Sequence, residues 1–217
     1  MSLKPNYNTH FYYSFDQLKE NPHVVNIYLD YNCPFSGIFY NKFYEQVIPK
    51  LEKAHPGKFQ FVFVNVVQPW HPNSVFLNEF ALAFAKLLRE HKTPDANKLF
   101  WEFNNVVFHE KQKFYDSVTQ GLNRNQNYEN IYDVVAKKFK FPFDRDTVLN
   151  TLYIKANTDE PNNDGNSATA DIKYFTKFLR TTNIHVTPSV QINGVNVADI
   201  ESSTAPDVMV EKFGAHL

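Results

Sequence analysis

The 217-residue chain has a single cysteine, Cys33, so no disulfide can form within it. It also has no second cysteine for a thiolate zinc site, no His-Glu-x-x-His motif and no glycine-rich phosphate loop. No apolar run approaches the roughly 20 residues that a membrane helix needs, and the first residues lack the basic and then apolar pattern of a secretory signal. We therefore expect no metal site, no membrane contact and a cytoplasmic location.

The chain also lacks an excess of either acidic or basic residues. The chain carries 22 Lys and Arg residues against 23 Asp and Glu residues, a formal net charge of −1. Acidic and basic side chains alternate along the sequence, so nothing favours nucleic acid or an anionic membrane surface as a partner. Hydrophobic residues make up 43% of the chain, enough to bury a sizeable core. The pattern leaves the oligomeric state open.

The most informative stretch surrounds the cysteine. Residues 24–29 (VVNIYL) are apolar and rich in β-branched and aromatic side chains, which predicts a buried strand. Pro34 suits the first position of a helix, and apolar residues then recur at helical spacing from Phe35 onward. The sequence therefore places Cys33 between a strand and a helix, at the N-cap of that helix.

An N-cap position changes what a thiol can do. Its side chain can accept hydrogen bonds from the backbone N–H groups of Phe35 and Ser36, and it lies at the positive end of the helix dipole. Both effects favour the thiolate, which is the nucleophilic form of cysteine. The Ser36 hydroxyl can add a further donor. The alternative is that Cys33 only fills space in the core, as many free cysteines do.

A second strand is predicted at residues 59–67 (FQFVFVNVV), after a helix that runs to about Ala54 and is interrupted by Gly37 and Pro49. A strand, helix, strand order implies parallel pairing, so the loop after this strand emerges at the same sheet edge as Cys33. His71 in that loop can pair with the thiolate or carry a proton, although it can also be a plain turn residue.

Two further positions need a choice between chemistry and structure. Asp30, at the end of the first strand, can relay a proton from the thiol through water or can simply cap a turn. Pro188 cannot donate to a strand ladder, so it belongs at a strand's first residue or at an edge, and we expect a cis bond before it.

The rest of the chain is mainly helical. Residues 74–155 predict an all-helical block, with helices near 75–91 (Ser74 as N-cap), 96–108, 114–121, 128–139 and 144–154. Residues 1–20 predict an edge strand or an arm that packs on the core. A helix at 168–182, strands at 186–192 and 195–198 joined by Asn193-Gly194, and a helix at 205–213 follow.

Taken together, this order resembles the thioredoxin fold with a helical insertion. More narrowly, it resembles the DsbA-like family, whose relatives include kappa-class glutathione transferases and 2-hydroxychromene-2-carboxylate isomerases. Cys33-Pro34-Phe35-Ser36 matches the C-x-x-C motif of that family, and Thr187-Pro188 matches its cis-proline loop. The resemblance implies an α/β fold in which residues 1–73 and 156–217 form a thioredoxin-like domain and residues 74–155 form the insertion.

The chain departs from this family at Ser36, which stands in place of the second, resolving cysteine. A mixed disulfide at Cys33 must then be resolved by an outside thiol such as glutathione. The leading prediction is a monothiol oxidoreductase without a tightly bound cofactor, acting on a small thiol or on a protein thiol or disulfide, with glutathione as co-substrate. Cys33 and Ser36 are its predicted catalytic residues, and the predicted thiol-binding residues are Pro34, Phe35, Trp70, His71, Thr187 and Pro188.

Two other functions remain open. In a glutathione-dependent transferase or isomerase, Phe35 and Trp70 would line an apolar pocket. A catalytically silent binding or chaperone-like domain would keep the fold without the reaction. The transferase and isomerase relatives use a serine near the strand-to-helix junction to hold the glutathione sulfur, whereas this chain has Cys33 there, which favours redox chemistry.

Overall fold

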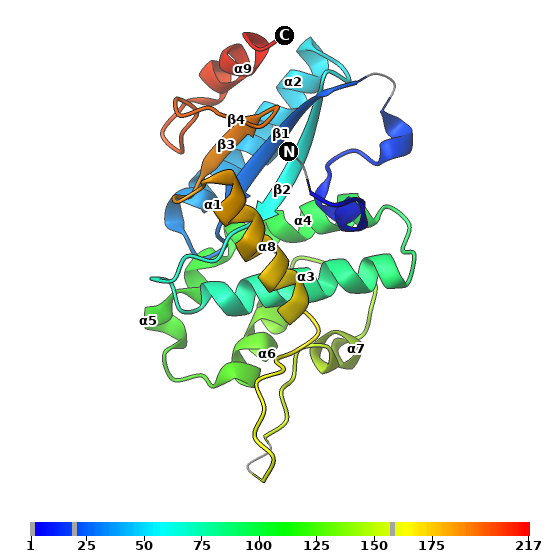
Figure 1. The fold of residues 1–217 in the computed structure, drawn as a ribbon, viewed down its shortest axis with the longest axis vertical. Coiled ribbons are helices and arrows are strands. Elements are labelled where there is room, and N and C mark those ends of the chain that lie inside the picture. The colour runs from blue at the N-terminus through cyan, green and yellow to red at the C-terminus, as the bar shows by residue number, and fades with distance from the viewer. Residues whose placement is uncertain (1–2, 19–20, 157–158) are drawn as a thin grey trace.

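The computed structural model describes residues 3–18, 21–156 and 159–217. In this part of the chain a central sheet has the strand order β2-β1-β3-β4 (Figure 1). Its strands are β1 (His23–Leu29), β2 (Phe59–Asn65), β3 (Ser189–Ile192) and β4 (Val195–Asn196). β1 pairs in parallel with β2 and antiparallel with β3, which confirms the parallel pairing predicted from the strand, helix, strand order.

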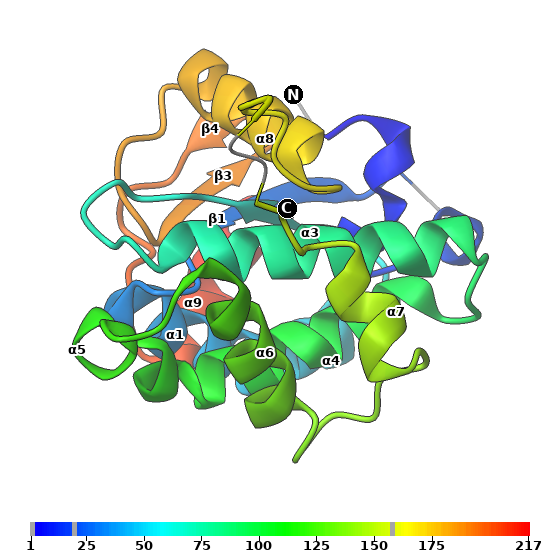
Figure 2. The same cartoon turned by 90° about the horizontal axis from the view of Figure 1, so that it is seen from below.

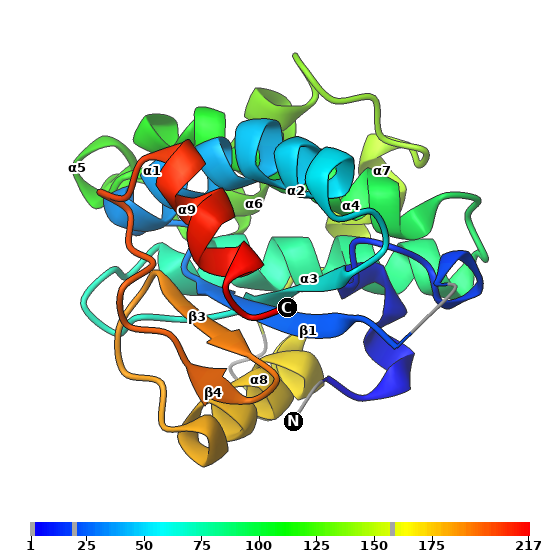
Figure 3. The same cartoon turned by 90° about the horizontal axis from the view of Figure 1, so that it is seen from above.

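Helices cover both faces of this sheet. α8 (Thr169–Thr182) lies on one face, and α1 (Pro34–Lys42), α2 (Ile48–Ala54) and α9 (Pro206–Gly214) lie on the other (Figure 3). All seven residues of β2 are buried. A parallel strand that is covered on both faces reads as a near-continuous apolar run, which is the pattern seen in the sequence.

The helix after Cys33 continues through a local irregularity. A π-helical turn, Phe43–Val47, separates α1 from α2, and the Ile48 N–H donates to the Phe43 carbonyl. Pro49 is the second residue of α2, which begins directly after this turn. Proline lacks an N–H and cannot complete the regular ladder, so the wider turn keeps the helix continuous where the sequence predicted a kink or a break.

The helical segment between β2 and α8 packs beside one end of the sheet (Figure 2). It contains α3 (Ser74–Glu90), α4 (Ala96–His109), a 3-10 turn Lys111–Phe114, α5 (Asp116–Thr119), α6 (Arg124–Val135) and α7 (Arg145–Asn150). Tyr31, two residues before Cys33, holds α4 near the cysteine. Its hydroxyl donates to Asn104 Oδ1 at 2.7 Å, and its ring stacks on Phe108.

Two helix starts differ from the sequence-based expectation. α3 has Asn73, not Ser74, as its N-cap, because the Ser74 hydroxyl is engaged elsewhere, by Asp30. α6 begins at Arg124, several residues before the predicted start, because Asn123 and Gln126 form a reciprocal capping box.

The N-terminal residues form an arm and not a regular edge strand. The 3-10 helix Pro5–His10 packs on the core through Tyr7, Thr9 and His10, whereas the 3-10 helix Phe15–Gln17 has no buried residue. An isolated antiparallel bridge joins Phe11 to Val62 of β2. Residues 1–2 and 19–20 of the predicted arm lie outside the described residues.

The C-terminal hairpin agrees with its sequence signal. Asn193 and Gly194 have φ values of 50° and 86°, the positive values that the turn requires. The Thr187–Pro188 peptide bond is cis, as predicted. In the described part of the chain, every helix is too short or too polar to cross a membrane.

Candidate active site

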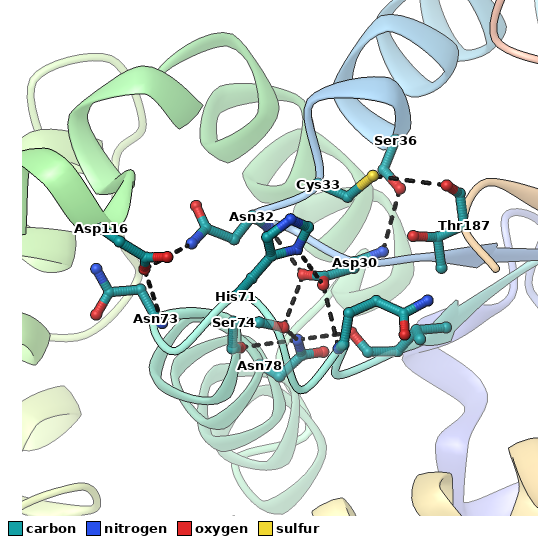
Figure 4. Close-up of polar contacts among 12 residues, drawn as sticks. Asp30, Asn32, Cys33, Ser36, His71, Asn73, Ser74, Asn78, Asp116 and Thr187 are labelled. Carbon is teal, nitrogen blue, oxygen red and sulfur yellow. Dashed lines mark hydrogen bonds and ion pairs between the residues drawn. The ribbon is translucent and has the colours of Figure 1, made fainter. Parts of the chain in front are cut away.

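Cys33 is the N-cap of α1, with extended backbone angles and Pro34 at the first helical position. Its side chain is almost fully buried. The sulfur makes no capping hydrogen bond with the helix, so the contacts expected with the N–H groups of Phe35 and Ser36 are not formed. It points across to the loop before β3, where Sγ donates to the Thr187 carbonyl at 3.5 Å (Figure 4). The cysteine therefore faces the cis-proline loop.

Ser36 is fully buried at the third position of α1. Its hydroxyl oxygen accepts a hydrogen bond from the backbone N–H of Asp30 at 3.3 Å. This contact ties the first turn of the helix back to the end of β1. A hydrogen bond from Ser36 to the sulfur stays a prediction.

Asp30 is a fully buried carboxylate that joins three segments. Oδ1 accepts from the Asn32 N–H at 2.9 Å and from the Ser74 hydroxyl at 2.7 Å. Oδ2 accepts from the Gln68 N–H at 3.2 Å and lies 3.2 Å from His71 Nδ1. Burial raises the pKa of Asp30, and the hydrogen bonds with Ser74, Asn32 and His71 act in the opposite direction. The bond from the Asn32 N–H is the turn-capping geometry that the sequence left as one alternative.

His71 lies at the same edge of the sheet as Cys33, as the parallel pairing of β1 and β2 predicted (Figure 4). Its partner is the carboxylate of Asp30 and not the sulfur. When Nδ1 carries the hydrogen and donates to Asp30, the other ring nitrogen, Nε2, keeps its lone pair and can act as a base. The structure thus shows an Asp30–His71 pair, which the sequence had treated as two separate candidates.

Large apolar side chains are exposed on the segments that flank the cysteine. Phe35 and Trp70 are 59% and 61% exposed, and Ile38 and Val186 add to them at 46% and 64%. We call these residues the apolar rim. Sequence reasoning singled out Phe35 and Trp70. It missed Val186, whose signal was its place directly before Thr187, and Ile38, which belongs to the apolar residues that recur at helical spacing after Phe35.

Two residues of the helical segment also face the cysteine. The Lys111 side chain lies against the backbone of Gly37, where a Cβ atom would be 2.6 Å from Lys111 Cδ and 2.8 Å from Nζ. Burial lowers the pKa of Lys111, and negative charge at Cys33 opposes this. Burial, and then the same charge, raise the pKa of Tyr115. The only sequence signal for this contact was Gly37, a glycine inside a helix.

The helical segment also holds the polar residues beside the cysteine in place. Asp116 Oδ1 accepts from Asn32 Nδ2 at 3.4 Å and from the Asn73 N–H at 3.2 Å. One carboxylate of α5 thus links the residue before Cys33 to the N-cap of α3. Among the described residues, no cluster of histidine, cysteine and acidic side chains could hold a metal ion.

Comparison with solved structures identifies the architecture. A Pseudomonas syringae protein, provisionally assigned as a protein-disulfide isomerase, aligns over 89% of this chain and 94% of its own, with a TM-score of 0.65 and 19% identity. BdbD from Bacillus subtilis aligns over 89% and 88%, with a TM-score of 0.57 and 21% identity. The chain has the DsbA-like thioredoxin fold.

A further DsbA-like structure, the thiol-disulfide exchange protein α-DsbA2 from Wolbachia pipientis, aligns over 92% of this chain and 84% of its own, with a TM-score of 0.56 and 17% identity. No protein-family model matches the sequence, and no curated protein matches it. The likeness to DsbA-like structures confirms the predicted fold, a thioredoxin-like sheet with a helical insertion.

Proposed function

We propose that this protein catalyses thiol–disulfide exchange through Cys33 alone, with glutathione or a similar small thiol completing the cycle. One observation carries the proposal: the single sulfur of the chain is the N-cap of α1 and faces the Thr187 carbonyl at 3.5 Å, while Ser36 occupies the position of a resolving thiol. The DsbA-like fold supports it, because the thiol-disulfide exchange protein α-DsbA2 has a similar structure.

The reaction has two balanced steps. The Cys33 thiolate attacks one sulfur of a disulfide, forms a mixed disulfide and releases the other sulfur as a thiolate, which takes up a proton. The thiolate of glutathione then attacks the sulfur of the former substrate, forms a glutathione mixed disulfide and releases the Cys33 thiolate. No net oxidation occurs in the protein, which returns to its starting state.

The Asp30–His71 pair would move the proton in these steps. Asp30 holds Nδ1, so Nε2 can take a proton as the Cys33 thiolate forms and return it to the leaving sulfur. This is the logic of a base oriented by a carboxylate, with a thiol as nucleophile.

The apolar rim and the Thr187 carbonyl would bind the disulfide partner. The carbonyl can accept a hydrogen bond from a peptide N–H of the partner once Cys33 has given up its hydrogen. The exposure of Phe35 and Trp70 favours an external thiol or protein partner over the enclosed apolar pocket that a transferase or isomerase needs.

The test is a mass-spectrometric one. We expect that the reduced protein, mixed with oxidised glutathione at neutral pH, gains one glutathionyl group on Cys33 and loses it again when reduced glutathione is added. Cys33→Ser should gain none. Exchange should then be followed as reduction of a mixed disulfide between glutathione and a cysteine peptide. Absence of the adduct would overturn the proposal. Conjugation of glutathione to an electrophile by Cys33→Ser would point to a transferase, and absence of glutathione binding would point to a silent domain.

A further inference from the structure

Lys111 is placed unlike the other lysines of its segment. Its side chain crosses from the 3-10 turn Lys111–Phe114 to the backbone of Gly37 in α1. The neighbouring Lys113 pairs with Glu110, and Lys138 pairs with the same carboxylate. Lys111 is half-buried and has no carboxylate partner among the residues that the structure describes. An ammonium group without a carboxylate partner can serve as the counter-ion of another anionic group nearby.

The group whose negative charge acts on Lys111 is Cys33. Gly37 lies four residues after Cys33, and its N–H donates to the Cys33 carbonyl at 3.2 Å. Cys33 is the N-cap of α1 and Gly37 is the fourth residue of that helix, so an ammonium group resting on Gly37 lies about one helical turn from Cys33 along the helix axis. We propose that Lys111 is the counter-ion of the Cys33 thiolate and that Gly37 provides the space through which it reaches the sulfur. The inference concerns the same site as the proposed function, on which its role in turnover rests.

The charge of Lys111 would stabilise the thiolate form of Cys33. A cation near a thiol favours the thiolate, and it does so most where water is excluded. Burial lowers the pKa of Lys111, and the negative charge of Cys33 counteracts this, as expected for two groups that stabilise each other's charged forms. Tyr115 lies nearby, and its raised pKa keeps its phenol neutral at physiological pH. It therefore adds no competing charge.

The other titratable groups around the cysteine are engaged elsewhere. Asp30 and His71 contact each other, Asp116 accepts from Asn32 and Asn73, and the His185 ring bonds to Asn183. Apart from the His71 imidazolium that forms when the proposed base takes the Cys33 proton, Lys111 is therefore the cation best placed to respond to the charge on the sulfur.

The second observation is that position 37, where Lys111 crosses α1, is a glycine. Glycine inside a helix costs about 1 kcal/mol relative to alanine. Alanine at position 37 would place its Cβ 2.6 to 2.9 Å from three atoms of Lys111, so the flexible lysine would have to move. The counter-ion role gives a physical reason for a glycine that helix stability disfavours.

The decisive experiment measures alkylation of Cys33 against pH with two reagents, neutral iodoacetamide and anionic iodoacetate. Lys111→Met should shift the midpoint of the rate profile upward by about one pH unit with both reagents, which is about tenfold in rate at pH values below both midpoints. Lys113→Met is the matched control and should leave the profile unchanged. If only iodoacetate were slowed, Lys111 would bind incoming anions and the counter-ion proposal would be wrong.

A second variant keeps the charge and changes only its position. Gly37→Ala should move the midpoint in the same direction as Lys111→Met, by a smaller amount, without loss of thermal stability. Gly121→Ala is the matched control, because a Cβ there has no neighbour within 4 Å. Lys111→Arg should restore most of the wild-type profile.

The results also separate this inference from the proposed function. If Lys111→Met alkylates like wild type while wild type still exchanges glutathione, the counter-ion role fails and the proposed function stands. If wild type forms no glutathione adduct but Lys111→Met is slower with both reagents, the proposed function fails and the counter-ion role stands.

Discussion

His71 Nδ1 lies 3.2 Å from Asp30 Oδ2, and this contact joins the loop after β2 to the end of β1 beside Cys33. The carboxylate is fully buried and the imidazole is partly exposed. Asp30 therefore holds Nδ1 of the His71 ring. The other ring nitrogen, Nε2, remains available to the site. Two residues 41 positions apart in sequence thus form one hydrogen-bonded pair.

The first prediction concerns this pair. His71→Asn should slow glutathione exchange at pH 7 by about a hundredfold, because a positioned acid–base group contributes roughly that much or more. Asp30→Asn should slow exchange and change the pH dependence of Cys33 alkylation. His185→Asn, at an exposed ring bonded to Asn183, is the control and should exchange at the wild-type rate. An unchanged pH dependence in Asp30→Asn would remove Asp30 from the mechanism.

The second prediction restores a two-cysteine motif. Ser36→Cys places a thiol at the third position of α1, one turn from the N-cap Cys33. We expect an intramolecular disulfide, seen as the loss of two hydrogens by mass spectrometry, and dithiol reductase activity without added glutathione. Wild type should require glutathione. Two free thiols that persist under mild oxidant would show that the two side chains do not meet.

The third prediction tests the apolar rim. Phe35→Ser and Trp70→Ser should each raise the KM for a peptide disulfide several-fold. The rate of Cys33 alkylation by iodoacetamide should not change in Phe35→Ser, because this exposed ring lies outside the Asp30–His71 pair. Trp70→Ser is a test of KM only, because the Trp70 ring packs edge-on against the ring of His71. Val118→Ser is the control, since Val118 is 61% exposed on α5 and lies outside the rim. Equal KM values for Phe35→Ser and wild type would exclude this residue from substrate binding.

The fourth prediction is a stability effect far from the cysteine. His10 is fully buried, with its ring nitrogens near Thr9 Oγ1 and Asn65 Oδ1, and burial lowers its pKa from 6.5 to about 3. The folded state holds His10 neutral while the unfolded state binds a proton below pH 6.5. Its stability contribution is therefore complete above pH 6.5 and is lost as the pH falls toward 3.

Urea unfolding measures this effect. Between pH 6.5 and pH 5, titration of His10 should cost about 2 kcal/mol of unfolding free energy, from about 1.4 kcal/mol per pH unit. His10→Gln should show a smaller loss over this range than wild type. His216→Gln, at an exposed position, should behave like wild type. The same loss in His10→Gln and wild type would assign the pH dependence to other groups.

Local patterns were enough to predict much of the fold. The apolar run of residues 24–29, Pro34 after Cys33 and the helical spacing that follows describe neighbouring residues, so they predicted β1, the N-cap and α1. Asn193-Gly194 predicted its turn because the required positive φ values belong to those two residues themselves. Helix ends were less certain, because capping depends on which partner a side chain finds. Ser74 is an example, because its hydroxyl donates to Asp30 and does not cap α3.

The sequence by itself determined that one thiol stands between a strand and a helix and that no second thiol can resolve it. Only the tertiary structure decided what surrounds that thiol. Cys33 meets Thr187 from 154 positions away, and Lys111 rests on Gly37 from another segment. Such contacts depend on how helices and loops dock against the sheet, through packing and hydrogen bonds between segments far apart in the chain, and no local periodicity encodes them.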